Sequence, residues 1–161
     1  MAMLHDCYRL TLEGARVALD AAEKRARDMK IPMNIAIVDD GGTLVAFVRM
    51  DGAKLGSAAV SITKAHSSAI RRQPTGPAMV NAEPNAILSL GLALASHMEQ
   101  TPVRGGLPLI FADQVVGAIG VSNGTEDQDL EVAVAGAEAF GAACRAEPES
   151  QRGFEAIEGN A

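Results

Sequence analysis

Two pairs of apolar segments constrain the fold of this 161-residue chain more than any other feature. The first pair, "MNIAIVDD" and "TLVAFVRM", is joined through "DDGG", and the second, "LPLIF" and "QVVGAIGV", is joined at residues 112–114. Asp and Gly tolerate positive φ, and each pair predicts an antiparallel β-hairpin. Both hairpins are apolar at nearly every position. This indicates a sheet covered on both faces, by the chain's own helices alone or together with a second subunit.

Segments with the apolar spacing of amphipathic helices lie before, between and after the two predicted hairpins. Apolar residues recur every three or four positions through residues 4–29 and again through 56–74, where Pro74 ends the pattern. A last helix is predicted to begin at Thr125, whose hydroxyl forms a capping box with Gln128. The apolar positions expected to be buried are Val60, Ile62, Ala65 and Ala69 in the second helix, and Leu130, Val134, Ala137 and Gly141 in the last.

The stretch between Pro74 and the second hairpin is less regular, and it predicts a short helix after Pro84 followed by a short strand. The order helix, hairpin, helices, hairpin, helix predicts an α+β domain with a central antiparallel sheet flanked by helices. We assign residues 1–145 to this single domain and 146–161 to a C-terminal tail.

Composition excludes some partners and locations. A net charge of −6, with basic residues scattered among acidic ones and no Trp, argues against nucleic acid. No apolar stretch reaches the length of a membrane span, and the N-terminus lacks the pattern of a signal peptide, so we expect no membrane partner and a cytoplasmic protein. Cys7 and Cys144 match no metal-ligand spacing and are expected to be two buried thiols in a reducing compartment rather than a disulfide.

Glycines near the second hairpin form no nucleotide-binding motif. Gly117, Gly120 and Gly124 are spaced three and four apart, and no lysine follows them, unlike a dinucleotide fingerprint or a P-loop. Gly117 and Gly120 fit either close packing against another backbone or the floor of a pocket. Gly105 and Gly106 likewise fit either a tight turn or the close approach of a ligand to the backbone.

Several polar residues are candidates for binding a ligand, binding a metal or transferring a proton. Arg49 and Asp51 end a hairpin strand, where they form either a surface ion pair or part of a pocket. His66 lies between Ile62 and Ile70 on one stripe of the second helix. It is either a packed side chain or an iron ligand or general base. His97 is the other candidate metal ligand, and the histidine spacing matches no zinc motif.

Several of these segments together resemble the GlcG/HbpS-like family, whose domain also forms the C-terminus of PduO-type corrinoid adenosyltransferases. The matching pieces are V-D-x-G-G, R-M-D-G-A, the T-K-A before His66, G-G-L-P and V-G-A-I-G-V-S. This chain departs from the family at Asn123, where a further glycine is usual, at His66, often aromatic, and at Gln114, often glycine.

The resemblance implies a fold like those of profilin and PAS domains and assembly into multimers up to octamers. It also implies haem or another tetrapyrrole as the ligand of some relatives, and a setting in small-acid catabolism for others. The matched positions nearest a pocket are Arg49, Asp51, Lys64, Gly105, Gly106 and Glu126. No haem ligand carries over by motif, so His66 and His97 are inferred from imidazole chemistry.

Three functions therefore remain open. The first is a multimeric cytoplasmic protein that holds haem or a similar planar ligand, with His66 or His97 on the metal. The second is an enzyme for a small anionic catabolite, with Arg49 or Lys64 binding a carboxylate and His66, Glu126 or Asp129 moving a proton. The third is an assembly or accessory protein without a small ligand.

Overall fold

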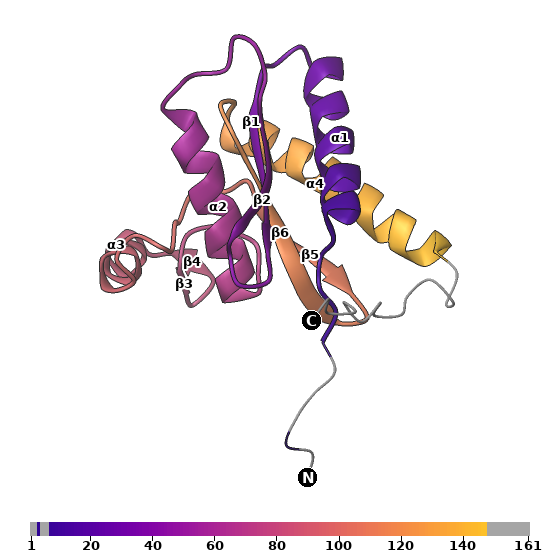
Figure 1. Ribbon diagram of the computed structural model, residues 1–161. Coiled ribbons are helices and arrows are strands. Elements are labelled where there is room, and N and C mark those ends of the chain that lie inside the picture. Colours follow the sequence, from indigo (N-terminus) through magenta and orange to yellow (C-terminus); the bar gives the residue numbers. More distant parts are fainter. Residues whose placement is uncertain (1–2, 4–6, 148–161) are drawn as a thin grey trace, which may run out of the picture.

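The computed structural model describes residue 3 and residues 7–147. It contains four α-helices and six strands in these residues (Figure 1). Their order is α1 (Leu12–Asp28), β1 (Asn34–Asp39), β2 (Leu44–Arg49), α2 (Ser57–Arg71), β3 (Met79–Val80), β4 (Glu83–Pro84), α3 (Ala86–Ala95), β5 (Gly106–Phe111), β6 (Gln114–Ser122) and α4 (Glu126–Ala146). The predicted tail lies outside the described residues from residue 148 onward.

Both predicted hairpins are confirmed, and they share one antiparallel sheet in the order β2-β1-β6-β5. The second turn is tighter than expected, because Gln114 already pairs with Phe111 as the first residue of β6. Ala112 and Asp113 have φ of +46° and +61°, the left-handed pair that a two-residue hairpin turn requires. The α+β prediction is therefore confirmed, with the two hairpins joined by the pairing of β1 with β6.

Helices α1 and α4 cover one face of the sheet. Ala15, Ala18, Ala22 and Ala26 form a fully buried stripe along α1, which lets this helix approach both the sheet and α4. The predicted helix over residues 4–29 begins later, at Leu12, because the Thr11 hydroxyl accepts a hydrogen bond from Gly14 N–H and caps the helix there. Residues 4–6 of that prediction lie outside the described part of the chain.

The capping box of Thr125 and Gln128 is confirmed at the start of α4, but the predicted buried stripe of α4 is wrong. Val134 is partly exposed, whereas Asp129, Val132, Ala133, Gly136 and Phe140 are buried. The cause is Gly136, since a Cβ there would lie 2.7 Å from the Ala18 carbonyl oxygen. Because of this close contact with α1, the buried face of α4 contains Asp129 and Gly136 in place of the predicted Leu130 and Val134.

Helix α2 covers the opposite face of β1, β6 and β5, and here too the prediction needs correction. Val60 is partly exposed, and the buried face contains Ser61, Lys64, Ala65 and Ser68 together with Ser67 and Ala69. A Cβ at Gly120 would lie 2.1 Å from the Ser61 carbonyl oxygen, so the helix backbone touches the sheet. Gly120 is therefore a packing glycine, and only small or backbone-bonded residues fit between helix and sheet. Gly117 is also closely packed, since a Cβ there would lie 2.5 Å from the Val38 carbonyl oxygen in the neighbouring strand and 2.8 Å from Leu10 Cδ2.

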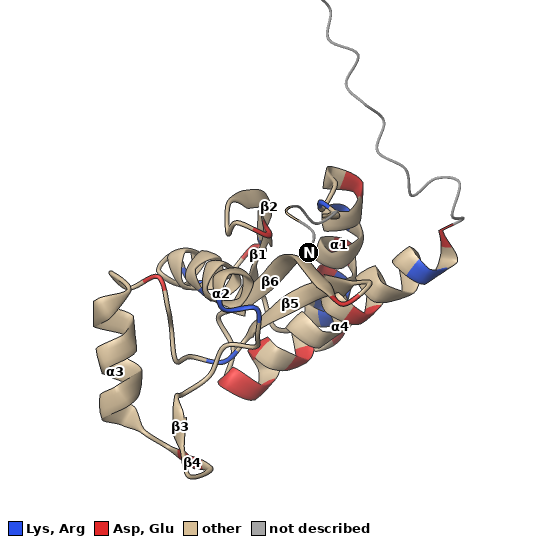
Figure 2. Cartoon of the chain, turned by 90° about the horizontal axis from the view of Figure 1, so that it is seen from below, with Lys and Arg blue, Asp and Glu red and all other residues tan. Residues whose placement is uncertain are grey.

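The region between α2 and β5 extends away from this two-sided sheet (Figures 1 and 2). The predicted short helix after Pro84 is confirmed as α3, but the short strand expected after it is absent from the described residues. A two-stranded ribbon of β3 and β4 precedes α3 instead. None of the helices in the described part of the chain is long and apolar enough to cross a membrane.

Candidate functional site

His66 lies on the flank of α2, where the β1–β2 turn closes over its ring. Nδ1 is 3.0 Å from the Gly42 carbonyl oxygen, and a Cβ at Gly42, whose φ is +84°, would lie 2.3 Å from the same nitrogen. Because a carbonyl oxygen only accepts, this contact fixes the proton of the neutral imidazole on Nδ1 and leaves a lone pair on Nε2. Nε2 is buried and has no hydrogen-bond partner among the described residues, although the ring as a whole is partly exposed.

Apolar side chains of the edge strand β2 lie on the same side of the sheet as α2. Phe47 pairs with Ala36 and Leu44 with Val38, and directly paired residues point to one face. Ala36 and Val38 pack against α2 together with Ile62, so Leu44 and Phe47 share that side. They are 46% and 37% exposed, because α2 covers β1 and β6 and barely reaches β2.

We call Leu44, Phe47, Ile62 and His66 the His66 patch. It combines apolar surface with an imidazole nitrogen whose lone pair is unused. Such a nitrogen, held by an Nδ1–H bond to a backbone carbonyl, is the usual arrangement of a histidine that ligates a metal. Because Nε2 is itself buried, an apolar ligand that carries a metal or a hydrogen-bond donor reaches this nitrogen only if the side chains that cover it move aside.

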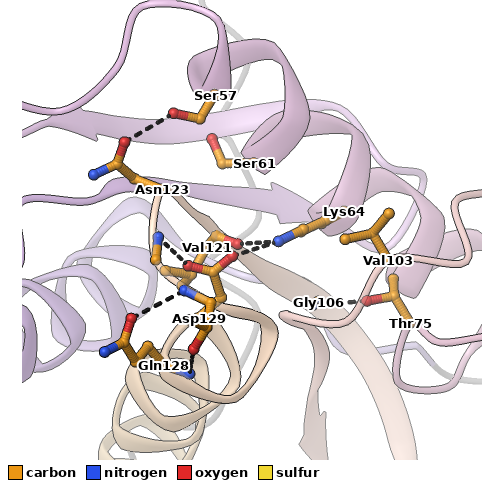
Figure 3. Close-up of polar contacts among 12 residues, drawn as sticks. Ser57, Ser61, Lys64, Thr75, Val103, Gly106, Val121, Asn123, Gln128 and Asp129 are labelled. Atoms are coloured by element: carbon orange, nitrogen blue, oxygen red, sulfur yellow. Dashed lines mark hydrogen bonds and ion pairs between the residues drawn. The ribbon is translucent and has the colours of Figure 1, made fainter.

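Lys64 and Asp129 form a buried ion pair on the other flank of α2 (Figure 3). Lys64 Nζ donates to Asp129 Oδ2 and to the Val121 carbonyl oxygen, each at 2.8 Å. Asp129 Oδ1 accepts from Gly124 N–H at 2.8 Å. The side chains are only 1% and 4% exposed, so the pair joins α2, β6 and α4 and is shielded from dissolved molecules.

Gly105 and Gly106 lie against this pair. A Cβ at Gly105, whose φ is +115°, would be 3.0 Å from Lys64 Nζ, and one at Gly106 would be 2.4 Å from the Lys64 carbonyl oxygen. Gly106 N–H also donates to the Thr75 hydroxyl at 2.9 Å. The space beside both glycines is thus filled by the protein itself, and their role in this structure is close backbone packing.

Arg49 and Asp51 lie at the end of β2, beside the last turns of α1. Together with Glu23, Arg27, Val48 and Met50 they line a hollow of about 310 Å³, which we call the Arg49 hollow. Arg27 is paired with Glu23, whereas Arg49 and Asp51 form no ion pair within the described part of the chain. The two residues thus line a hollow and are not paired with each other, and their role in binding a ligand stays a prediction.

The other predicted site residues lie apart from both the patch and the hollow. Glu126 is exposed in the first turn of α4, and His97 is exposed just beyond α3. Across residues 7–147, no three His, Cys, Asp or Glu side chains gather into a group that could hold a metal ion. The structure therefore brings Lys64 and Asp129 together, and separately Arg49 and Asp51, but it does not assemble all predicted residues into one site.

A polar cluster at the start of α2 was not anticipated from the sequence. Asn123 Oδ1 accepts from Lys54 N–H at 3.0 Å and from the Ser57 hydroxyl at 3.3 Å, the latter drawn in Figure 3. Asn34 donates to the Lys54 carbonyl oxygen and to Ser57, at 3.0 and 3.1 Å. The sequence feature that could have indicated this cluster is the Asn at position 123, where a glycine is usual. The φ of Asn123 is +138°, which explains that preference for glycine.

Comparison with known proteins places the chain in a family. A family model described as "Haem degrading protein HbpS-like" matches residues 10–138. The chain belongs to the HbpS-like family. It is 34% identical over 131 residues to a 15.0 kDa protein of the dhaT-dhaS intergenic region of Citrobacter freundii, covering 81% of this chain and 92% of that protein. It is also 34% identical over 115 residues to GlcG of Escherichia coli K12, covering 70% of this chain and 81% of GlcG.

Two solved structures share the fold. The ORFY protein of Klebsiella pneumoniae superposes with a TM-score of 0.79 at 33% identity, covering 88% of this chain and 97% of ORFY. A PduOC–haem complex superposes with a TM-score of 0.70 at 24% identity, covering 82% of this chain and 95% of PduOC. The resemblance to the GlcG/HbpS-like family seen in the sequence is thereby confirmed.

Proposed function

We propose that this HbpS-like protein binds haem or a related tetrapyrrole at the His66 patch. The observation that carries the proposal is the buried Nε2 of His66, which keeps its lone pair while Nδ1 is held by the Gly42 carbonyl oxygen. An unused buried nitrogen costs free energy in the unliganded protein, and a metal ligand bond would recover it. The description of the family as haem degrading and the solved complex of PduOC with haem support this class of ligand.

In this proposal each residue of the patch has a separate task. His66 is the iron ligand, and the Gly42 carbonyl oxygen orients its ring and increases its basicity through the Nδ1–H bond. Leu44, Phe47 and Ile62 offer apolar contacts to the macrocycle. Haem bound there supplies an iron centre that accepts the imidazole lone pair. His97 is exposed and lies outside the patch, so we assign the ligand role to His66 rather than to His97.

The proposal includes the setting expected from the sequence, a multimer of up to eight chains in the cytoplasm. The cytoplasmic setting rests on the sequence, which predicts two buried thiols in a reducing compartment; the burial is wrong for Cys7, which is exposed. The multimeric state rests on the resemblance to the family and on apolar surface left exposed in the single chain.

A haem titration followed by absorbance tests the ligand. The wild-type chain should shift the Soret band with saturation, and His66→Ala should abolish that shift or weaken binding by about 10- to 100-fold. His97→Ala is the matched control and should bind as the wild type does. No band shift in the wild type, or an unchanged spectrum and affinity in His66→Ala, would overturn the assignment.

A second candidate function is supported by the Arg49 hollow. Its volume of about 310 Å³ suits a small organic acid, and the guanidinium of Arg49 can hold a carboxylate through two hydrogen bonds. The residues expected to move a proton, His66, Glu126 and Asp129, do not line the hollow, and neither does Lys64, the other expected carboxylate-binding residue. Asp51 is therefore the carboxylate available for proton transfer. Calorimetric titration with small hydroxy- and keto-acids tests this candidate. Arg49→Gln should abolish binding, and equal binding by Arg49→Gln and wild type would exclude the candidate.

A further inference from the structure

The V-D-x-G-G motif, residues 38–42, leads from β1 into the turn before β2, which lies against α2 (Figure 1). The aspartate of the motif, Asp39, organises this turn. Its Oδ1 accepts from Gly41 N–H at 3.0 Å and from Thr43 N–H at 2.8 Å. The backbone closes the same turn, because Asp39 N–H donates to the Thr43 carbonyl oxygen at 2.9 Å and Gly42 N–H to the Asp39 carbonyl oxygen at 3.0 Å. The Asp39 side chain thus makes two of the hydrogen bonds that hold the turn.

One peptide group connects the Asp39 carboxylate to His66. Its N–H belongs to Thr43 and donates to Asp39, and its carbonyl oxygen belongs to Gly42 and accepts from His66 Nδ1 at 3.0 Å. A trans peptide is planar, and its N–H and C=O point in opposite directions. The carboxylate that holds the N–H on one side therefore directs the carbonyl oxygen toward the imidazole on the other. The φ of +84° at Gly42, which favours glycine, lets the chain present the peptide in this orientation.

The same connection carries the effect of the charge of Asp39. A carboxylate that accepts from a peptide N–H makes the carbonyl oxygen of that peptide a stronger acceptor, because hydrogen bonds in a chain polarise one another. A stronger Nδ1–H bond in turn raises the basicity of Nε2, as a carboxylate bonded directly to a metal-binding histidine does. Asp40 has the same charge, but within residues 7–147 its side chain makes no hydrogen bond to this turn.

We propose that Asp39 is a positioning residue for His66. Through the peptide between Gly42 and Thr43, its carboxylate fixes the proton of His66 on Nδ1 and raises the electron density at Nε2. The inference rests on the function proposed above, in which Nε2 binds the haem iron, and it adds the residue that sets the strength of that bond. It also gives both parts of the motif a task, since the aspartate supplies the acceptor and the second glycine the positive φ.

Nitrogen NMR of the chain without haem tests the positioning. At about pH 9, where histidine side chains are neutral, the ring nitrogens of His66 should report a proton on Nδ1 in the wild type. Asp39→Ala removes the acceptor of both N–H groups, and His66 should become a mixture of its two tautomers. Asp39→Asn keeps an acceptor oxygen and should retain the proton on Nδ1, as should Asp40→Ala, the matched control. The wild-type tautomer in a folded Asp39→Ala would overturn the proposal.

Haem titration and the reduction potential of the bound iron test the effect on Nε2. Asp39→Ala should weaken haem binding by about 10- to 100-fold and shift the Soret maximum of the bound form. Asp39→Asn keeps the geometry and loses the charge. It should bind nearly as the wild type does but raise the reduction potential, because a weaker donor stabilises ferric iron less.

Asp40→Asn controls for charge acting through space, since it removes the same charge one position away. The rise in potential should be larger in Asp39→Asn than in Asp40→Asn, and equal rises would overturn the proposal. This comparison decides the case in which Asp39→Ala fails to fold.

The two measurements separate this inference from the proposed function. A wild type that binds no haem would exclude haem as the ligand of His66, and the NMR comparison would still decide whether Asp39 positions the ring. Conversely, haem binding by the wild type, with an unchanged tautomer and affinity in Asp39→Ala, would leave the haem site standing and remove Asp39 from it.

Discussion

Lys64 Nζ lies 2.8 Å from Asp129 Oδ2, and the two side chains are almost completely buried between α2 and α4. The pair also holds backbone groups: Lys64 donates to the Val121 carbonyl oxygen and Asp129 accepts from Gly124 N–H. The ion pair therefore connects α2, the end of β6 and the first turn of α4. Asp129 was a candidate for proton transfer and Lys64 for binding a carboxylate, and their contacts give both a stabilising role whichever ligand the protein binds.

Removal of either charge should destabilise the protein strongly. Lys64→Met leaves the Asp129 carboxylate buried without its partner, and Asp129→Leu does the same to the Lys64 ammonium, each at a cost of roughly 3–5 kcal/mol in the free energy of unfolding. The double variant should cost less than the sum of the two, because no unpaired charge remains. Urea unfolding of the three variants measures the coupling. Lys24→Ala, which breaks the exposed pair with Asp28, is the control and should leave the urea midpoint close to that of the wild type. Strictly additive losses would contradict the pairing.

Local signals in the sequence predicted most of the fold. The turn residues of "DDGG", the capping residues Thr125 and Gln128 and the alternating strands act over a few positions, and the structure confirms each of them. The buried helix faces were predicted only in part, since Ala65 and Ala69 of α2 are buried as expected but Val60 of α2 and Val134 of α4 are not. Helix α2 buries Ser61 and Lys64 while Val60 is partly exposed, because Gly106 and Gly120 bring the helix backbone onto the sheet. That contact joins distant segments, and helical periodicity alone carries no information about it.

The candidate site, too, could be predicted only in part from the sequence. The sequence singled out His66 and Arg49 by residue type, and the structure gives them a buried unpaired nitrogen and a hollow. The sequence could not show that Lys64 and Asp129 are paired with each other, since 65 positions separate them in the chain. Nor could residue type show that Gly105 lies against that pair, because this follows from the path of the chain between β5 and α2.

Gly120→Ala should weaken the contact between α2 and the sheet. The added methyl would lie 2.1 Å from the Ser61 carbonyl oxygen and 2.4 Å from Ala65 N, so the helix backbone must move. Overpacking of this kind costs about 1–3 kcal/mol, measured as a lower midpoint in thermal or urea unfolding. Gly56→Ala is the matched control, because its Cβ would meet nothing within 4 Å and its φ of −65° suits alanine. Equal stability of the two variants would refute the close contact at Gly120.

Substitutions of Asn123 should separate backbone strain from hydrogen bonding. Asn123→Gly relieves the positive φ of +138° but removes the bonds to Lys54 N–H and to the Pro32 carbonyl oxygen. Asn123→Ala removes the same bonds and keeps the strain, so it should be the less stable of the two by about 1–3 kcal/mol. Urea unfolding of both variants measures the difference. If Ala is tolerated as well as Gly, the backbone conformation costs nothing at this position.

The Lys24–Asp28 pair on α1 should be visible as a shifted titration. The hydrogen bond from Lys24 Nζ to Asp28 Oδ2, 2.7 Å long, and the charge of Lys24 hold the pKa of the Asp28 carboxyl below its ordinary value. A pKa depressed by folding contributes stability above the ordinary pKa of aspartate, and this is lost as pH falls through the folded value. NMR titration should give Asp28 a higher pKa in Lys24→Gln than in the wild type, and an unchanged pKa would show that the pair does not persist in solution.

Two neighbouring glycines in the β1–β2 turn allow a test of how His66 is positioned. A Cβ at Gly42 would lie 2.3 Å from His66 Nδ1, whereas one at Gly41 would lie 3.4 Å from Asp39 Oδ1, an ordinary contact. Gly42→Ala should therefore displace the ring and break its bond to the Gly42 carbonyl oxygen while the imidazole itself is kept. In the haem titration we expect Gly42→Ala to weaken binding by about 10- to 100-fold and to shift the Soret maximum of the bound form, as loss of a positioning contact does. Gly41→Ala should bind and absorb as the wild type does. Wild-type affinity and spectrum in Gly42→Ala, with the fold confirmed by circular dichroism, would show that the turn does not orient the ligand and that Nε2 of His66 is not the nitrogen on the iron.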